Sequence, residues 1–319
     1  MRDMLISGRP ATAGWGRPFA IGLPFLGPPE RRLLCGGPRN GNHDGNTVWG
    51  AIGADMNHRT VTDAATIVIA PGVTGVDLTS YQDELVRLSL PGQLVARLRE
   101  MDKVKPLNRI FVMGCGRSGT WLVTGVMCTF ADVCVVGQEV PVETFGILSS
   151  AQSTLVLKRA NNSFARIREV PQEIGIAYII RHPFDVLTSH HPNHLRRFHI
   201  RPERWLGEMM ALQYLMRTKR TRTKIVGYED LVRDPTAVQG ALAKAFELKA
   251  SVPAGDFMAR FTPSPKAQAA VDCVRKIDTN AIGRYKKDPE SVQHLKEIRP
   301  RLGPLLDWVT TEFGYELSL

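Results

Sequence analysis

The fold is decided by one stretch, Phe111-Val112-Met113-Gly114-Cys115-Gly116-Arg117-Ser118-Gly119-Thr120-Trp121-Leu122. An apolar segment of strand type runs into a glycine-rich turn, and the turn opens an apolar helical segment that extends to Phe130. Glycines let successive backbone N–H groups face inward, and the N-terminus of a helix adds partial positive charge. Ser118 and Thr120 add hydroxyl donors, and Arg117 adds a planar cation. The stretch therefore predicts a loop that binds an anion.

This loop departs from the phosphate loop of nucleotide kinases, which has the pattern GxxxxGK followed by Ser or Thr. Gly114 and Gly119 have the required separation, but Thr120 stands at the lysine position and Trp121 at the Ser/Thr position. The hydroxyl that would bind magnesium is therefore missing, and the loop is typical of phosphate binding without a metal. The alternative is an ordinary strand–turn–helix whose glycines serve the backbone geometry alone.

Apolar segments of strand length recur along the later part of the chain, at residues 110–113, 132–136, 154–157, 176–180 and 224–228. Apolar residues at helical spacing lie between them. This alternation predicts the α/β class, here a three-layer, P-loop-like parallel sheet flanked by helices. Ligands of such sheets bind beyond the carboxyl ends of the strands. The residues at or just past those ends are Arg117, Lys158, Arg181 and Tyr228.

The chain divides into three regions by composition. Residues 1–60 are rich in Gly, Pro, Arg and Asn, and they predict a disordered or loosely packed segment without a convincing secretory signal. Residues 61–107 form an N-terminal extension of uncertain fold, with a short strand over 65–70 and leucines at helical spacing that Pro91 interrupts. Residues 108–319 hold the regular domain.

Charge and composition narrow the classes of partner. The formal net charge of +10 indicates either a protein that handles anions or an arginine-rich solvated surface. Aromatic residues make up only 7% of the chain and no RNA-reading motif is present, so we expect no nucleic-acid partner. No apolar run reaches about 18 residues, so we expect no transmembrane segment.

The spacing of cysteines and histidines does not predict a metal site. The five cysteines form no CxxC pair, and they predict reduced thiols and a cytoplasmic location. A cluster of histidines matches no common ligand spacing, so we expect no metal. Its members are His190, His191, His194 and His199.

A second segment, residues 178–189, predicts another anion site. A strand ends at Arg181, Pro183 suits the first turn of a helix, and Ser189 lies about two turns further on. An arginine at a strand end with a nearby hydroxyl suits a dianionic phosphate. Asp185 is expected to cap or brace the helix rather than to touch a ligand.

Together these segments resemble the sulfotransferase family. Residues 116–122 are similar to its 5′-phosphosulfate loop, whose usual form is Pro-Lys/Arg-Ser-Gly-Thr-Thr, and Arg181 to Ser189 resembles its 3′-phosphate motif. Two departures exist, since Gly116 replaces the usual proline and Trp121 replaces the second threonine. The adenine-stacking tryptophan of the cytosolic branch lies one position later, so that role does not transfer to Trp121.

Two downstream segments extend the resemblance over about residues 108–316. Residues 227–235 are similar to the family's YEDL segment, and residues 282–287 resemble a Gly-Arg-Trp-Lys segment that closes over the 3′-phosphate. The resemblance implies 3′-phosphoadenosine 5′-phosphosulfate as co-substrate, with no metal. The residues implied to bind it are Gly116, Arg117, Ser118, Gly119, Thr120, Trp121, Arg181, Ser189, Tyr228, Gly283 and Arg284.

The resemblance also implies the groups that act in catalysis. Lys158 occupies the position of the family's catalytic lysine, with the neighbouring Arg159 as the alternative, and Arg117 is the second cation. The histidine base of the cytosolic branch is absent, because position 160 is alanine. The context of Gly137-Gln138-Glu139 is similar to a Gly-Glu-Glu string of the tyrosyl-protein branch, so Glu139 is the predicted general base. Glu143 and a histidine of the cluster are the alternatives.

The predicted reaction is transfer of a sulfuryl group to a hydroxyl or amine of a small-molecule, carbohydrate, lipid or peptide acceptor. Two other functions stay open. One is an ATP-dependent P-loop phosphotransferase, which the missing Gly-Lys-Ser/Thr argues against. The other is a catalytically inactive nucleotide- or nucleic-acid-binding protein.

Overall fold

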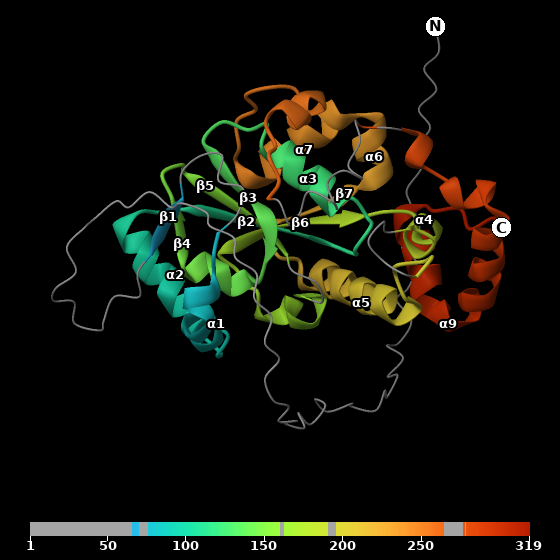
Figure 1. Ribbon diagram of the computed structural model, residues 1–319, viewed down its shortest axis with the longest axis horizontal. Coiled ribbons are helices and arrows are strands. Elements are labelled where there is room, and N and C mark those ends of the chain that lie inside the picture. Colours follow the sequence, from blue (N-terminus) through green and yellow to red (C-terminus); the bar gives the residue numbers. More distant parts are fainter. Residues whose placement is uncertain (1–65, 70–75, 160–162, 191–195, 265–276, 278) are drawn as a thin grey trace, which may run out of the picture. The chain divides into compact units, whose positions relative to one another are not determined.

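A parallel five-stranded sheet forms the centre of the fold in a computed structural model of the protein (Figure 1). The structure describes residues 66–69, 76–159, 163–190, 196–264, 277 and 279–319. The strand order is β3-β5-β2-β6-β7, and every neighbouring pair is parallel. The strands are β2 (Asn108–Gly114), β3 (Val133–Val140), β5 (Thr154–Arg159), β6 (Ile174–Ile180) and β7 (Thr223–Gly227). The predicted α/β class and all five predicted strands of this sheet are confirmed.

Both faces of the sheet are covered, which explains why its strands read as continuous apolar runs. Along β2, Ile110 and Val112 pack into one hydrophobic cluster, and Phe111 and Met113 pack into the other. The first cluster lies under α3, α6 and α7, and the second lies over α5 and extends to α9 (Figure 1). These helices are α3 (Thr120–Met127), α5 (Pro202–Thr218), α6 (Tyr228–Arg233), α7 (Pro235–Phe246) and α9 (Pro289–Phe313).

Residues 76–107 pack onto the same domain. Leu88, Leu94 and Leu98 are buried in its core, against the segment that follows β3. The elements here are η1 (Thr79–Tyr81), α1 (Gln82–Leu88), α2 (Gln93–Val104) and η2 (Val142–Gly146), and β1 (Ile67–Ile69) pairs in parallel with β4 (Leu148–Ser150). The helical spacing is confirmed, with the predicted interruption at Pro91. The expectation for residues 1–60 lies outside the described residues.

Three boundaries differ from the sequence-based expectation. Tyr228 begins α6 instead of ending β7, because Glu229 and Asp230 place acidic groups in the first turn of a helix. β3 continues to Val140 through an irregularity described below. The helix after the glycine-rich loop ends at Met127, three residues before Phe130.

Short elements complete the part of the chain that the structure describes. They are η3 (Ser163–Glu169), α4 (Pro183–Leu187), η4 (Ala254–Ala259), η5 (Thr279–Ala281) and η6 (Arg284–Lys287). Within that same part, no helix has the length and apolar character needed to cross a membrane.

Candidate functional site

The glycine-rich loop after β2 is held in a conformation that requires its glycines. Gly114 has φ +147° and Gly119 has φ +100°, both in the region that side chains rarely adopt. A Cβ on Gly114 would lie 2.5 Å from the carbonyl oxygen of Ile179, and one on Gly119 would lie 2.7 Å from the ring of Tyr228. The loop is therefore pressed between the end of β6 and Tyr228, and Thr120 begins α3 directly after it.

Ser118 and Trp121 have well-defined surroundings in this loop. The hydroxyl of Ser118 is buried and donates to the carbonyl oxygen of Cys115 at 2.6 Å, so in this structure it braces the turn. Trp121 lies in the first turn of α3, with its ring 4.3 Å from the amine of Lys158 and 5.9 Å from the ring of Phe261. A cation over an indole face is a favourable arrangement. Trp121 therefore connects the loop to the predicted catalytic lysine.

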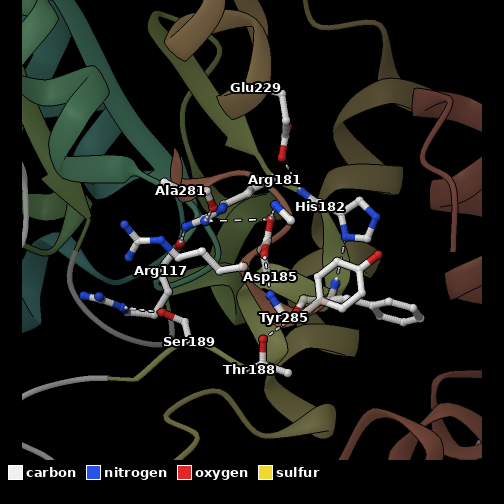
Figure 2. A network of polar contacts seen from close by, with 12 residues as sticks. Arg117, Arg181, His182, Asp185, Thr188, Ser189, Glu229, Ala281 and Tyr285 are labelled. Carbon is white, nitrogen blue, oxygen red and sulfur yellow. Dashed lines mark hydrogen bonds and ion pairs between the residues drawn. The ribbon is translucent and has the colours of Figure 1, made fainter. Parts of the chain in front are cut away.

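The two predicted anion segments meet at Arg117 and Ser189. Arg117, with φ +68°, extends its side chain away from its own loop, and its Nε donates to the Ser189 hydroxyl at 2.9 Å. Arg181 donates to the carbonyl oxygen of Arg117 at 3.3 Å. Figure 2 shows these side chains converging from the loop after β2 and from the segment after β6. Residues 72 positions apart in sequence thus form one polar site.

Arg181 is also the link to Tyr228 and to the segment that begins at residue 279. Its guanidinium lies 4.2 Å from the centre of the Tyr228 ring, and its Nη2 donates to the carbonyl oxygen of Ala281 at 2.5 Å. Burial raises the pKa of Tyr228, and the nearby guanidinium groups oppose this effect. Gly283 adopts φ +69° at the start of η6, and Arg284 beside it is exposed. The residues here that the sequence predicted to bind the nucleotide are Arg181, Tyr228, Gly283 and Arg284.

Lys158 and Glu139 face each other across β5 and β3 because β3 is irregular. Val135 pairs with Val156 and Glu139 pairs with Lys158, so β3 uses four positions where β5 uses two. Such a bulge redirects side chains and is common beside functional sites. The Lys158 amine is ion-paired with the Glu139 carboxylate. Burial lowers the pKa of Lys158 to about 8, although Glu139 acts in the opposite direction.

The alternative residues lie in other surroundings. Alternation along β5 turns Arg159 to the opposite face from Lys158, where it forms a 2.5 Å ion pair with the buried Glu208 of α5. Glu143 is buried in η2 and ion-paired with Arg166.

Of the histidine cluster, His199 donates its backbone N–H to the carbonyl oxygen of Ser189. His191 and His194 lie outside the described residues. Among the residues that the structure does describe, no three His, Cys, Asp or Glu side chains gather as a metal site.

Arg204 is a cation of this site that the sequence did not identify. It projects from the first turns of α5 onto the glycine-rich loop, where a Cβ on Gly116 would lie 3.0 Å from its Nη2. Its charge is also one of those that lower the pKa of Lys158. Glycine in place of the family's usual proline was the available signal, because Gly116 leaves the space that this guanidinium occupies.

The fold and the glycine-rich loop define a structural class. A parallel sheet with a glycine-rich loop after its central strand and helices on both faces is a P-loop-like α/β fold. No family model matches the sequence, and no curated protein matches it.

One solved sulfotransferase domain shares this fold, and two further solved structures are less similar. The sulfotransferase domain from the curacin biosynthetic pathway matches with a TM-score of 0.51 and 14% identity, over 66% of this chain and 99% of that domain. The sulfotransferase domain from the Synechococcus PCC 7002 olefin synthase matches with a TM-score of 0.49 and 13% identity, over 67% and 96%. Mouse sulfotransferase SULT7A1 complexed with PAP matches with a TM-score of 0.31 and 14% identity, over 66% and 95%. At such identities the first match establishes a shared fold and nothing about activity.

Proposed function

We propose that this protein transfers a sulfuryl group from 3′-phosphoadenosine 5′-phosphosulfate to a hydroxyl or amine of an acceptor. The observation that carries the proposal is the 2.9 Å hydrogen bond between Arg117 and Ser189. It joins two anion-binding segments from separate strand–helix units into one site. A nucleotide with a phosphosulfate at its 5′ end and a phosphate at its 3′ position needs two such segments side by side.

The residues present fit the two ends of this donor. The 5′ end suits the curled backbone of the glycine-rich loop, the N-terminus of α3 and the guanidinium of Arg204. The 3′-phosphate suits Arg181, Ser189, Gly283 and Arg284. Arg181 is already oriented by two backbone carbonyl oxygens, so little ordering would be required to bind.

In the proposed step, the carboxylate of Glu139 takes the proton of the acceptor hydroxyl or amine. The acceptor oxygen or nitrogen forms a bond to sulfur while the bond from sulfur to the bridging phosphate oxygen breaks, and adenosine 3′,5′-bisphosphate leaves. Lys158 donates a hydrogen bond to an oxygen on which charge develops, whereas Arg117, the second cation predicted from the sequence, is hydrogen-bonded to Ser189 in the segment proposed to bind the 3′-phosphate. A preorganised donor aimed at developing charge contributes about 3–4 kcal/mol, and a positioned base contributes about 10²–10⁴-fold.

The acceptor is proposed only by class, as a small molecule, carbohydrate, lipid or peptide with a free hydroxyl or amine, and the proposed location is the cytoplasm. The rival ATP-dependent phosphotransferase would need magnesium, and the loop offers Thr120 and Trp121 where lysine and a metal-binding hydroxyl would stand.

The test is a transfer assay with sulfur-labelled donor against a panel of sugars, phenols, lipids and peptides. We expect label to reach at least one acceptor class, with the same rate in EDTA as in magnesium. The parallel arm uses ATP labelled on its terminal phosphate. Magnesium-dependent transfer from ATP, or no transfer from the sulfuryl donor to any class, would refute the proposal.

A further inference from the structure

Asp185 connects the segment after β6 to a loop almost one hundred residues later. Its side chain is fully buried, and its Oδ2 accepts a hydrogen bond from the backbone N–H of Gly283 at 2.8 Å. The backbone N–H of Tyr285 lies 3.4 Å from the other carboxylate oxygen. In Figure 2 the carboxylate of Asp185 lies between Arg181 and Tyr285. The sequence suggested only that Asp185 caps or braces its own helix.

Arg181 lies four residues earlier, directly after β6, and contacts the same loop through a hydrogen-bond donor instead of an acceptor. Its Nη2 donates to the carbonyl oxygen of Ala281 at 2.5 Å, and it lies 3.8 Å from Oδ2 of Asp185. Arg181 thus donates a hydrogen bond to a backbone carbonyl oxygen of the loop, and Asp185 accepts hydrogen bonds from backbone N–H groups of the same loop. A buried carboxylate is stable only when such partners surround it, so neither contact can be exchanged for water without cost.

The left-handed turn at Gly283 lies at the centre of this arrangement. Gly283 has φ +69°, and it directly precedes the exposed Arg284. Because the Gly283 N–H is fixed by Asp185, the direction in which the chain leaves this turn is fixed as well. The position of Arg284 relative to Arg181 therefore depends on the Asp185 carboxylate.

We propose that Asp185 is a positioning residue that sets the selectivity of the site for a nucleotide 3′-phosphate. It holds residues 281–285 beside Arg181, so that the Gly283 turn and Arg284 face the phosphate that Arg181 and Ser189 bind. This inference rests on the proposed function, because it presupposes that the nucleotide carries a 3′-phosphate.

The test compares two nucleotides that differ only in that phosphate. Dissociation constants for adenosine 3′,5′-bisphosphate and adenosine 5′-monophosphate are measured for the full chain and for Asp185→Asn. The asparagine keeps the shape but places an N–H₂ group against a backbone N–H or the Arg181 guanidinium. We expect affinity for the bisphosphate to fall about tenfold or more, and affinity for the monophosphate to change less than about twofold.

A second variant covers the case in which Asp185→Asn fails to fold. Gly283→Ala leaves the carboxylate intact and strains only the turn, since a Cβ there would meet no atom within 4 Å. It should give the same selective loss. Gly314→Ala is the matched control, because Gly314 has φ +68° and equally open surroundings but lies at the end of α9.

The outcomes separate the inference from the proposed function. If the unaltered protein does not prefer the bisphosphate, the proposed function fails, and the inference fails with it. If the unaltered protein prefers the bisphosphate but both variants keep that preference, only the inference is overturned. Equal losses for both nucleotides would also overturn it, because they indicate general damage to the fold.

Discussion

Lys158 and Glu139 form an ion pair across two neighbouring parallel strands, with the ring of Trp121 against the lysine amine. The lysine is almost fully buried, whereas about a third of the Glu139 side chain is exposed. A buried cation beside a carboxylate that reaches solvent suits a pair in which one member stabilises charge and the other exchanges a proton. The pair therefore gives the most direct mutational tests of the proposed chemistry.

Lys158→Ala should remove turnover and leave nucleotide binding largely intact. The amine is proposed to act on charge that develops only during transfer, so we expect kcat to fall by about 10²–10³-fold. The Kd for adenosine 3′,5′-bisphosphate should change much less. Lys244→Ala, on the exposed side of α7, is the control and should alter neither quantity. Similar losses of kcat and of nucleotide affinity would contradict the catalytic role proposed for Lys158.

The rate should fall on the alkaline side as Lys158 loses its proton. Burial lowers the pKa of Lys158 to about 8, so the charged form is lost as the pH rises through that value. We expect kcat/KM to decline above about pH 8. Glu139 raises this pKa, so its removal in Glu139→Gln should move the decline to lower pH. A pH profile that is flat from 7 to 10 would contradict the assignment.

Glu139→Gln and Glu143→Gln should separate the two candidate bases. Loss of the base costs about 10²–10⁴-fold in rate, and we expect that loss for Glu139→Gln at saturating donor. Glu143 is buried against Arg166, so its substitution should act mainly on the melting temperature. Rates and melting curves are measured for both variants. A larger rate loss in Glu143→Gln would transfer the proposed role to that residue.

Arg204→Ala should weaken binding at the 5′ end of the nucleotide. Its guanidinium lies over Gly116, so the losses for adenosine 3′,5′-bisphosphate and adenosine 5′-monophosphate should be equal, at about tenfold each. Gly116→Ala should reproduce part of the loss, because a Cβ would displace the guanidinium. Arg217→Ala, exposed on the same helix, is the control. Unchanged affinities in Arg204→Ala would show that Arg204 does not contribute to nucleotide binding.

The strands were predictable because burial on both faces leaves a continuous apolar run in the sequence. The same reasoning predicted that Lys158 and Arg181 lie near the same end of the sheet, because the carboxyl ends of parallel strands all point the same way. The bulge that brings Glu139 opposite Lys158 was not predictable, because it depends on the register between β3 and β5. The resemblance indicated Glu139, but its ion pair with the predicted lysine came only from the structure.

Contacts between distant segments could not be predicted from the sequence either, because they depend on how the helices and loops pack. Arg204 follows the glycine-rich loop by more than eighty residues, and only the packing of α5 brings it to Gly116. Asp185 reaches Gly283 across 98 positions. Arginine and aspartate are common on helices, so nothing local distinguishes these two from surface residues. The substitution of glycine for proline at position 116 was a visible signal that could be interpreted only after α5 was placed.

The central claim is that one site binds both ends of a doubly phosphorylated nucleotide without a metal, and calorimetric titration in EDTA tests it directly. We predict that adenosine 3′,5′-bisphosphate binds the folded protein at least about tenfold more tightly than adenosine 5′-monophosphate, and that Ser189→Ala reduces this preference. The absence of binding, or tighter binding of ATP once magnesium is added, would contradict it.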